Sequence, residues 1–421
     1  MKKSLFCGIL TFIYITLNAA SATVYASGLT AVYSDGSLPV KAEAGPAKVT
    51  ARDEEIPAKK GTSLKNIQPG DTFAGKDDQG SSVEFREVWG YLMRGEEKLF
   101  RGDEPVTDIC YFSCTVNSRG RLNLNVNPPS IPDLNGRRRR VHMVISDLTN
   151  TGLMHYTMNP KYGVRDLLVG DIIELSKKFD GVQIDFEAVA DKDGADFQEF
   201  LRLIKAGMEK DKIFSVALPS RVSAIPGDAY DYTIISEIVD RVFIMAYDQH
   251  WSTSKPGPVA SLTWCKNIVN FARQTIPADK LIMGIPLYGR EWQEKKVKAR
   301  TVKVKQYKTV KAANSKKKSK KKVVVRTIKI PARVEVSSKS VRSCNLPEIA
   351  SDSRARKEYS VDTGLTMKIK YNKNSEAVLY CDDVKATREK FLLYREFVDS
   401  VGFWRLGMQS PDLWKEIRIV D

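Results

Sequence analysis

The segment Phe179–Glu187 holds the residues whose types and spacing best suit chemistry, because it places Gln183, Asp185 and Glu187 at alternate positions. Successive side chains of a strand point to opposite faces, so these three share one face. Two carboxyls at such positions lie about 7 Å apart along the strand. Burial and mutual repulsion then raise the pKa of one of them, which can act as a general acid near neutral pH. The alternation of side chains alone favours neither this catalytic role nor a polar layer of the barrel interior without a catalytic role.

The elements that must position these carboxyls follow from the alternation of apolar runs with amphipathic stretches after Glu84. The pattern predicts strands at Glu87–Met93, Asp108–Cys114, Val141–Leu148, Gly181–Glu187, Ile213–Pro219, Arg241–Tyr247, Leu281–Pro286 and Val401–Leu406. It predicts helices at Val164–Lys178, Asp196–Lys210, Leu262–Thr275 and Arg388–Val398. This order indicates an α/β fold, a (β/α)8 TIM barrel, in which chemistry lies at the carboxyl ends of strands. A doubly wound open sheet is disfavoured, because no Gly-rich phosphate turn follows the first strand.

The pattern Asp180-x-x-Gln183-x-Asp185-x-Glu187 resembles the D-x-x-D-x-D-x-E signature of family 18 glycoside hydrolases, the chitinase-like enzymes. Further motifs follow in the family's order: Trp89-Gly90-Tyr91, Thr107–Ser113, Met245-Ala246-Tyr247-Asp248, Gly284–Arg290 and Gly402–Gly407. The resemblance covers the chain from about Glu84 to its end. It is strongest to bacterial members of the spore-germination and cell-wall N-acetylglucosaminidase branch.

The resemblance implies a retaining, substrate-assisted mechanism in which the substrate's own acetamido oxygen attacks the anomeric carbon. Glu187 would be the general acid and later the base, and Asp185 would orient the acetamido group and stabilise positive charge. Tyr247 would donate its hydroxyl to that group, and Trp404 would form the floor under the sugar unless it is only a core residue. Further sugar or loop contacts would be Asp248, Tyr288 and Arg290, the last two alternatively bracing the barrel rim.

Gln183 departs from the chitinase pattern, which has an Asp at this position that shares a proton with the residue matching Asp185. An amide can hydrogen-bond Asp185 but cannot take up its charge, so we expect activity with a changed pH profile. Cell-wall members of the family often carry an amide here. The expected substrate is therefore a β-linked N-acetylglucosamine polymer of the peptidoglycan type rather than chitin. The alternatives are a non-catalytic chitinase-like glycan-binding protein and a cell-wall interaction protein.

Charge is concentrated in one segment of this 421-residue chain, whose 67 basic and 51 acidic residues give a net charge of +16. Residues 294–342 hold 19 basic and 2 acidic residues, so the remainder has 67 − 19 = 48 basic and 51 − 2 = 49 acidic residues. Alternating runs at Val302–Lys305 and Val323–Ile330 predict a hairpin with a Lys-rich tip. Lys316–Lys322 would contact anionic cell-wall polymer, lipid headgroups or acidic substrate, or serve solubility alone. Nucleic acid is disfavoured, because the segment has one aromatic residue, Tyr307.

The amino terminus predicts export, because Lys2 and Lys3 precede an apolar run, Leu5–Leu17, that is shorter than the roughly 20 residues needed to cross a bilayer. The expected organisation is a signal peptide at 1–26, a flexible linker at 27–82 and a barrel at 83–421 with a basic insertion at about 293–380. We expect a secreted or periplasmic monomer. The scattered cysteines and histidines predict no metal or cofactor; Cys344 with Cys381 is one candidate bridge.

Overall fold

The structure, a computed structural model, describes residues 81–310 and 320–420, with the backbone alone at 306–310 and 320–324. The predicted signal peptide and nearly all of the predicted linker lie outside the described residues, as do the side chains of the predicted Lys316–Lys322 tip. Among the helices of the described ranges, none is long and apolar enough to cross a membrane.

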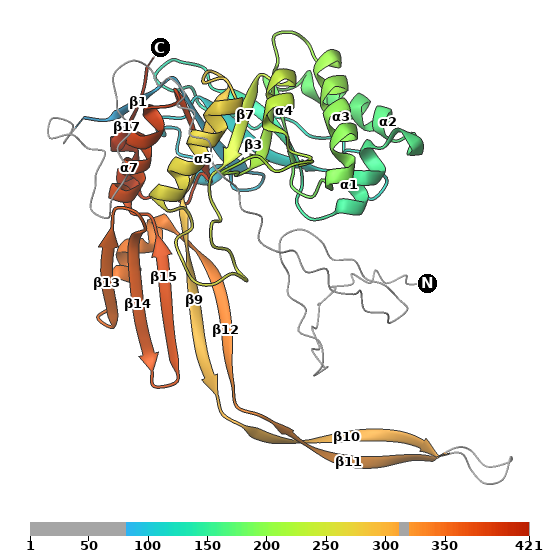
Figure 1. Cartoon of the computed structure of the whole chain (residues 1–421), viewed down its shortest axis with the longest axis vertical. Coiled ribbons are helices and arrows are strands. Elements are labelled where there is room, and N and C mark those ends of the chain that lie inside the picture. The colour runs from blue at the N-terminus through green and yellow to red at the C-terminus, as the bar shows by residue number, and fades with distance from the viewer. Residues whose placement is uncertain (1–80, 311–319, 421) are drawn as a thin grey trace, which may run out of the picture. The chain divides into compact units, whose positions relative to one another are not determined.

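Eight strands close into a barrel in the order β16-β2-β3-β4-β5-β6-β7-β8, and each neighbouring pair is parallel (Figure 1). The bounds are β2 Glu87–Met93, β3 Asp108–Thr115, β4 Arg140–Asp147, β5 Gly181–Phe186, β6 Ile213–Pro219, β7 Arg241–Met245, β8 Leu281–Pro286 and β16 Ser400–Trp404. The predicted barrel is therefore confirmed. β2, β6 and β8 have the predicted bounds, and the other five strands differ by one or two residues at their ends.

Helices follow most of the barrel strands. They are α1 Thr151–Met158, α2 Arg165–Ser176, α3 Gly194–Gly207, α4 Tyr232–Ile238, α5 Leu262–Thr275 and α7 Val384–Arg395. Short 3-10 turns occur at η1 Glu97–Leu99, η2 Pro160–Tyr162, η3 Asp191–Asp193, η4 Ser343–Asn345 and η5 Pro411–Glu416. β1 Val83–Phe85 pairs in parallel with β17 Ile417–Ile419 outside the barrel. Side-chain caps begin several helices; the Ser261 hydroxyl, for example, accepts from Trp264 N–H at the start of α5.

Polar side chains at the amino ends of the barrel strands form a buried charged network. Asp108, which is fully buried, accepts from Arg140 Nε at 2.6 Å, and its Oδ1 lies 2.7 Å from His142 Nε2. Burial opposes ionisation of Asp108, but the hydrogen bonds from His142 and Arg140 hold its pKa below the usual range. Glu87 accepts from both Arg140 and Arg241. Because this end of a barrel usually serves stability, we assign the network a structural role.

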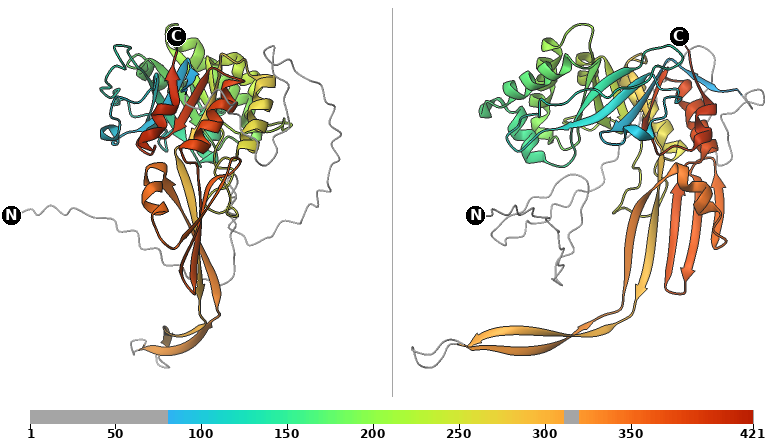
Figure 2. Two further views of the ribbon diagram at one scale, coloured as in Figure 1. Left: turned by 90° about the vertical axis from the view of Figure 1, so that its left-hand side faces the viewer. Right: turned by 180° about the vertical axis from the view of Figure 1, so that it is seen from behind.

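An inserted domain lies between β8 and α7. Its elements are β9 Tyr288–Val297, β10 Arg300–Val310, β11 Lys320–Ile330, β12 Arg333–Arg342, α6 Leu346–Ala350, β13 Ala355–Ser360, β14 Gly364–Asn372 and β15 Ser375–Cys381. Five of its strands form an antiparallel sheet in the order β12-β9-β15-β14-β13. β10 and β11 form a separate two-stranded antiparallel sheet, hereafter the ribbon, and so confirm the hairpin that the alternating pattern predicts (Figure 2).

Hydrogen bonds attach the inserted domain to α5 of the barrel, and the register of β9 and β12 defines where the ribbon begins. The Asp362 carbonyl accepts from Leu262 N–H at 2.8 Å, and its carboxylate accepts from Thr263 N–H at 2.7 Å, so Asp362 holds the first turn of α5. At the far end of β9, Val297 pairs directly with Arg333 of β12. The ribbon therefore leaves the sheet at one pair of adjacent residues.

The candidate bridge between Cys344 and Cys381 is wrong, because all five cysteines of the described residues are free. Cys381 is buried, and its sulfur lies 3.7 Å from the Ser343 hydroxyl. The thiol of Cys344, by contrast, is directed to the Asn345 side chain. The two sulfurs thus belong to different local environments although their backbones are near one another.

Candidate active site

Strand β5 positions the central residues of the site. Val182, Ile184 and Phe186 pack in the layer between strands and helices, where Phe186 stacks on Phe200 of α3 with ring centroids 5.8 Å apart. Gln183 and Asp185 face the barrel interior and are 0% and 3% exposed. The observed directions of these side chains agree with those predicted from their alternate positions along the strand. Glu187 is the first residue after β5, and its side chain is exposed at the strand's carboxyl end.

The pKa values of both Asp185 and Glu187 are raised, whereas the spacing predicts this for one of them. Burial, followed by the nearby charge of Glu187, raises the pKa of Asp185 well above its usual range. Burial, followed by the charge of Asp248, raises the pKa of Glu187 to about 7. Although part of the Glu187 side chain is exposed, neighbouring protein displaces enough water to favour the neutral carboxyl. Glu187 can therefore both donate and accept a proton near neutral pH.

Tyr247 and Asp248 lie just beyond the end of β7, after Ala246, and Asp248 contacts residues of β9. The Tyr288 hydroxyl donates to Asp248 Oδ1 at 2.7 Å, and Arg290 Nη2 lies 3.7 Å from the same oxygen. Tyr288 and Arg290 thus hold Asp248 in place, and their contacts to sugar stay a prediction. Burial, and then the charge of Asp185, raise the pKa of Tyr247, so its phenol stays protonated and can donate.

Trp404 ends β16 and is only partly buried. Its ring makes edge-to-face contacts with Tyr91 and Phe112, at centroid distances of 5.0 and 5.4 Å. The ring is therefore held by aromatic packing while part of it stays exposed. This arrangement suits the predicted floor of a sugar site better than a core role alone.

Glycines allow the rings beneath the site to pack closely. A Cβ on Gly402 would lie 2.2 Å from the Phe243 ring, and one on Gly284 would lie 3.0 Å from the Tyr247 ring and 2.6 Å from the Ile244 carbonyl oxygen. Neither position has room for a side chain. Gly284 and Gly402, the first residues of two of the family motifs, therefore leave space for the rings of Tyr247 and Phe243 inside the barrel.

The hydrogen bond that an amide at Gln183 could make to Asp185 is not formed, because the amide has other partners. Tyr91 Oη donates to Gln183 Oε1 at 2.5 Å, and Gln183 Nε2 donates to Ser215 Oγ at 3.3 Å. Side chains of β2 and β6 thus occupy the amide, and Asp185 Oδ1 is buried without a hydrogen-bond partner in the described part of the chain. An unpaired buried carboxyl oxygen is costly, which fits a group kept for a ligand. The changed pH profile stays a prediction.

Three residues of the site had no predicted role: Tyr91, Ser215 and Tyr230. Strand parity could have indicated Tyr91 and Ser215, because they point inward on β2 and β6, as Gln183 does on β5. Tyr230 lies in the connection between β6 and α4, where no periodicity marks it. Its hydroxyl donates to the Phe186 carbonyl at 2.8 Å and accepts from Val189 N–H at 3.0 Å. It therefore clamps the backbone on both sides of Glu187.

Replacing Tyr230 by Phe is expected to lower kcat about tenfold with little change in KM, because the loop that carries Glu187 loses both hydrogen bonds. Tyr232→Phe is the matched control, since its hydroxyl donates to the Pro219 carbonyl at 2.5 Å and does not contact that loop. Both variants should lose similar thermal stability. Steady-state kinetics and melting curves of the two variants provide the test. Equal losses of activity in both variants would contradict the positioning role of Tyr230.

Replacing Asp248 by Asn is expected to move the alkaline limb of kcat/KM to lower pH by roughly one unit. The negative charge of Asp248 raises the pKa of Glu187, so its removal lowers that pKa, and the protonated acid is lost at a lower pH. Asp248 has a φ of 59°, a conformation that Asn tolerates well, so the backbone should persist. Asp166→Asn on α2, whose side chain is 82% exposed, is the control. An unmoved limb in pH–rate profiles would show that Asp248 does not tune the acid.

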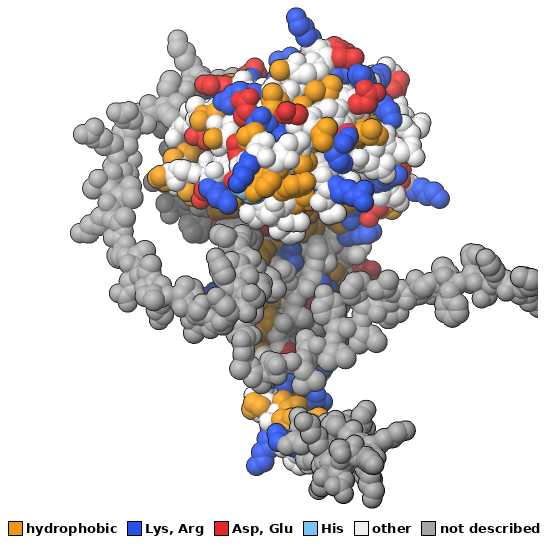
Figure 3. All heavy atoms as spheres, turned by 90° about the vertical axis from the view of Figure 1, so that its right-hand side faces the viewer, with side chains coloured by type: hydrophobic (Ala, Val, Ile, Leu, Met, Phe, Trp, Pro, Cys, Tyr) orange, Lys and Arg blue, Asp and Glu red, His pale blue; other side chains and the backbone are white. Residues whose placement is uncertain are grey.

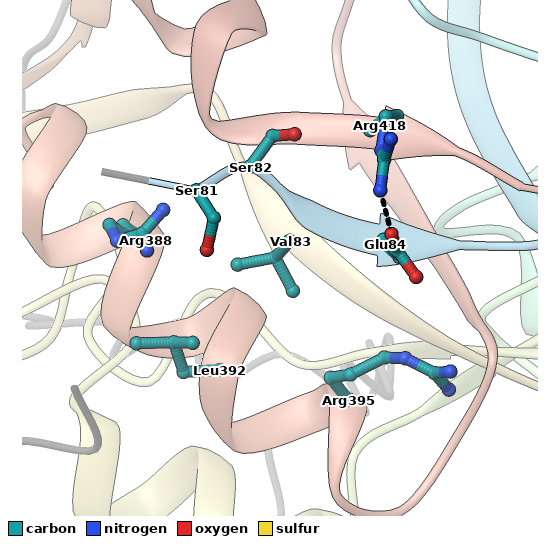
Figure 4. A pocket seen from close by; sticks show the side chains of 8 residues that line it. All are labelled: Ser81, Ser82, Val83, Glu84, Arg388, Leu392, Arg395 and Arg418. Atoms are coloured by element: carbon teal, nitrogen blue, oxygen red, sulfur yellow. Dashed lines mark hydrogen bonds and ion pairs between the residues drawn. The ribbon is translucent and has the colours of Figure 1, made fainter. Parts of the chain in front are cut away.

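A hollow outside the barrel contains none of the predicted site residues. It is lined by Ser81, Ser82, Val83, Glu84, Arg388, Leu392, Arg395 and Arg418, and the side chains of Glu84 and Arg418 form an ion pair there (Figure 4). Its guanidinium groups already have carboxylate partners, so we assign it no ligand. Across the described residues, no three His, Cys, Asp or Glu side chains are grouped as metal ligands.

Comparison with known proteins places this geometry in a family. The sequence model "Glycosyl hydrolases family 18" matches residues 168–409, which is more than half of the chain. The chain belongs to this family, which confirms the resemblance carried by its motifs.

Two relatives illustrate the likeness. The chain is 28% identical over 257 residues to "Uncharacterized glycosylase YvbX" of Bacillus subtilis, covering 59% of this chain and 63% of that protein. It is 21% identical over 327 residues to "Cortical fragment-lytic enzyme" of Bacillus anthracis, covering 74% of this chain and 67% of that protein. The chain thus spans less than two thirds of the first relative.

A solved structure shows the same fold. The spore cortex-lytic enzyme SleL of Bacillus cereus superposes with a TM-score of 0.61 at 19% identity, covering 81% of this chain and 76% of SleL. At this identity the likeness concerns the fold alone. The roles of the site residues therefore rest on their geometry.

Proposed function

We propose that the chain is a retaining glycoside hydrolase that cleaves β-linked N-acetylglucosamine polymers by substrate-assisted catalysis. The observation that carries the proposal is the pairing of Glu187, whose pKa is raised to about 7, with the buried Asp185. Tyr247 beside them is a protonated donor. An acid, a charge stabiliser and a hydroxyl donor are the groups that such a reaction needs.

The proposed reaction has two steps. In the first, the acetamido oxygen of the substrate forms a bond to the anomeric carbon while the glycosidic bond breaks, and Glu187 gives its proton to the leaving oxygen. Asp185 stabilises the positive oxazolinium ring, and Tyr247 donates to the acetamido group. In the second step, the water oxygen forms a bond to the anomeric carbon while the bond from that carbon to the acetamido oxygen breaks, and the Glu187 carboxylate takes the proton from water. Two displacements at one carbon retain the configuration.

The substrate we propose is glycan of the peptidoglycan type rather than chitin. Two observations support it: the amide at Gln183, which is frequent in cell-wall members of the family, and the names of the similar cortical fragment-lytic and cortex-lytic enzymes. The proposed site of action is outside the cytoplasm, with export directed by residues 1–26. Mass spectrometry of the secreted or periplasmic protein tests export, because cleavage should leave a new amino terminus near Ala22 or Ala26.

Product analysis tests the reaction. Purified peptidoglycan and chitin oligomers are digested, the products are reduced with borohydride, and the reduced sugar is identified by mass spectrometry. We expect reduced N-acetylglucosamine ends, released faster from peptidoglycan. Reduced N-acetylmuramic acid ends would place the cut at the other linkage. Cleavage of neither polymer with retained binding to either would identify a glycan-binding protein instead.

A further inference from the structure

The ribbon belongs to the longest stretch of the chain without acidic residues. Residues 295–334 contain 17 Lys or Arg and no Asp or Glu. The ribbon strands β10 and β11 form eleven cross-strand pairs, from Arg300–Ile330 to Val310–Lys320. The positive charges of the ribbon are thus held on two regularly paired strands. The proposed hydrolysis does not use these charges.

Register shows that both faces of the ribbon are basic. Paired residues share a face, so the described side chains of one face are Thr301, Lys303, Lys305, Val325, Thr327 and Lys329. Those of the other face are Arg300, Val302, Val304, Arg326, Ile328 and Ile330. Cations on one strand recur about every 7 Å, as Lys303 and Lys305 do. The ribbon therefore has cations on both faces, three lysines on one and two arginines among apolar residues on the other.

These cations are exposed and lack ion-pair partners. Arg300, Lys303, Lys305, Arg326 and Lys329 are all exposed, and none forms an ion pair with another described residue. Arg333 belongs to the same acid-free stretch and does form an ion pair, with Glu335, but it lies on β12 of the five-stranded sheet and not on the ribbon. In Figure 3 the visible part of the ribbon carries basic and hydrophobic side chains, whereas the barrel surface in the same view mixes basic and acidic ones.

Physical considerations call for an anionic partner. An isolated two-stranded ribbon is only marginally stable in water, and like charges at diagonal positions across the strands, such as Lys303 and Lys329, repel each other. A bound polyanion would remove that repulsion and release its own counterions. A bilayer fits less well, because insertion of the face with Val302 and Ile328 would also bury Arg300 and Arg326.

We propose that the ribbon binds an extended, flexible, phosphate-bearing polymer, which contacts cations on both of its faces. The same β9 strand that carries Tyr288 and Arg290 at the active site leads to the ribbon. The ten residues of β9, Tyr288–Val297, span roughly 30 Å of extended chain. The bound polymer would thus hold the barrel next to a cell wall, a function beyond the proposed hydrolysis.

The test measures binding of the full chain to labelled long-chain polyphosphate by fluorescence anisotropy over a range of salt concentrations. The variant Lys303→Gln/Lys305→Gln/Lys329→Gln should bind about tenfold or more weakly at low salt, and its salt slope should fall by roughly two. The control Lys357→Gln/Lys370→Gln/Lys373→Gln removes three exposed lysines of the inserted sheet outside the ribbon and should bind like wild type. Hydrolysis of a small soluble oligosaccharide should be unchanged in both.

Other outcomes overturn the proposal. Equal affinity of the ribbon variant and wild type would remove the ribbon from polyanion binding, and equal losses in both variants would mean only a net-charge effect. A second arm uses vesicles of equal phosphatidylglycerol and phosphatidylcholine. Tight vesicle binding that the ribbon variant loses, with unchanged polyphosphate binding, would identify a membrane surface instead. Because the readout is binding, the result does not depend on whether hydrolysis is observed.

Discussion

Replacing Glu187 by Gln is expected to lower kcat for glycan hydrolysis about a thousandfold. The amide keeps the size of the side chain but has no proton to give to the leaving oxygen and cannot take one from water. Burial and Asp248 raise the pKa of Glu187 to about 7, so wild type has both protonation forms available near neutral pH. Neither form exists in the variant.

Initial rates of reducing-end release measure this loss. Glu199→Gln is the matched control, because Glu199 lies on α3 with its side chain 47% exposed and away from the site. Substrate binding by the Glu187 variant should persist, since the hydrogen bonds that seat the acetamido group remain. Retention of more than about a tenth of wild-type activity would exclude Glu187 as the general acid.

Replacing Asp185 by Asn is expected to lower kcat about a hundredfold while KM changes little. Asn can still accept a hydrogen bond from the acetamido N–H, so binding of the ground state should persist. The positive charge exists only after the acetamido oxygen has attacked, and an amide cannot stabilise it as a carboxylate does. A rise in KM with unchanged kcat would instead make Asp185 a binding residue.

The same variant should be more stable than wild type by a few degrees in Tm at neutral pH and above. The pKa of Asp185 is raised in the folded protein, so the folded state disfavours its ionised form. Its ionisation therefore costs stability as pH rises from the unfolded pKa through the folded one, and costs none in acid below both. The gain in Tm should accordingly be larger at alkaline than at acidic pH.

Asp193→Asn provides the control for that stability effect. Asp193 is also 3% exposed, but its Oδ1 lies 2.7 Å from His155 Nδ1, so its carboxylate has a partner. Its replacement should lower Tm and leave kcat near the wild-type value. Equal Tm changes in both variants would contradict a special cost at Asp185.

The barrel and the central carboxyls could be predicted because local patterns specify them. The alternation in Gly181–Phe186 reports which side chains face the helices, and burial on both faces makes that register strict. The partners of Gln183 could not be predicted in this way. One comes from β6, which neighbours β5, and the other from β2, three strands away around the closed barrel, so they depend on how the barrel closes.

Other parts of the site lie where sequence carries little periodic information. Tyr230 acts from a connecting segment, and only the folded chain brings its hydroxyl to the backbone beside Glu187. Asp248 follows a strand that ends at Met245, two residues earlier than the apolar pattern predicts. The backbone of Asp248 is left-handed, with a φ of 59°, a conformation that an apolar pattern does not report.

The direct pairing of Val297 with Arg333 makes the ribbon a removable module. Opposed residues of an antiparallel pair have Cα atoms about 5 Å apart, a gap that a two-residue Asn-Gly turn closes. Residues 298–332 can therefore be exchanged for such a turn, or for another hairpin of any length, without altering the register of the five-stranded sheet. In evolutionary terms, the site and the ribbon can diversify separately, one by substitution and the other by insertion or deletion at a single junction.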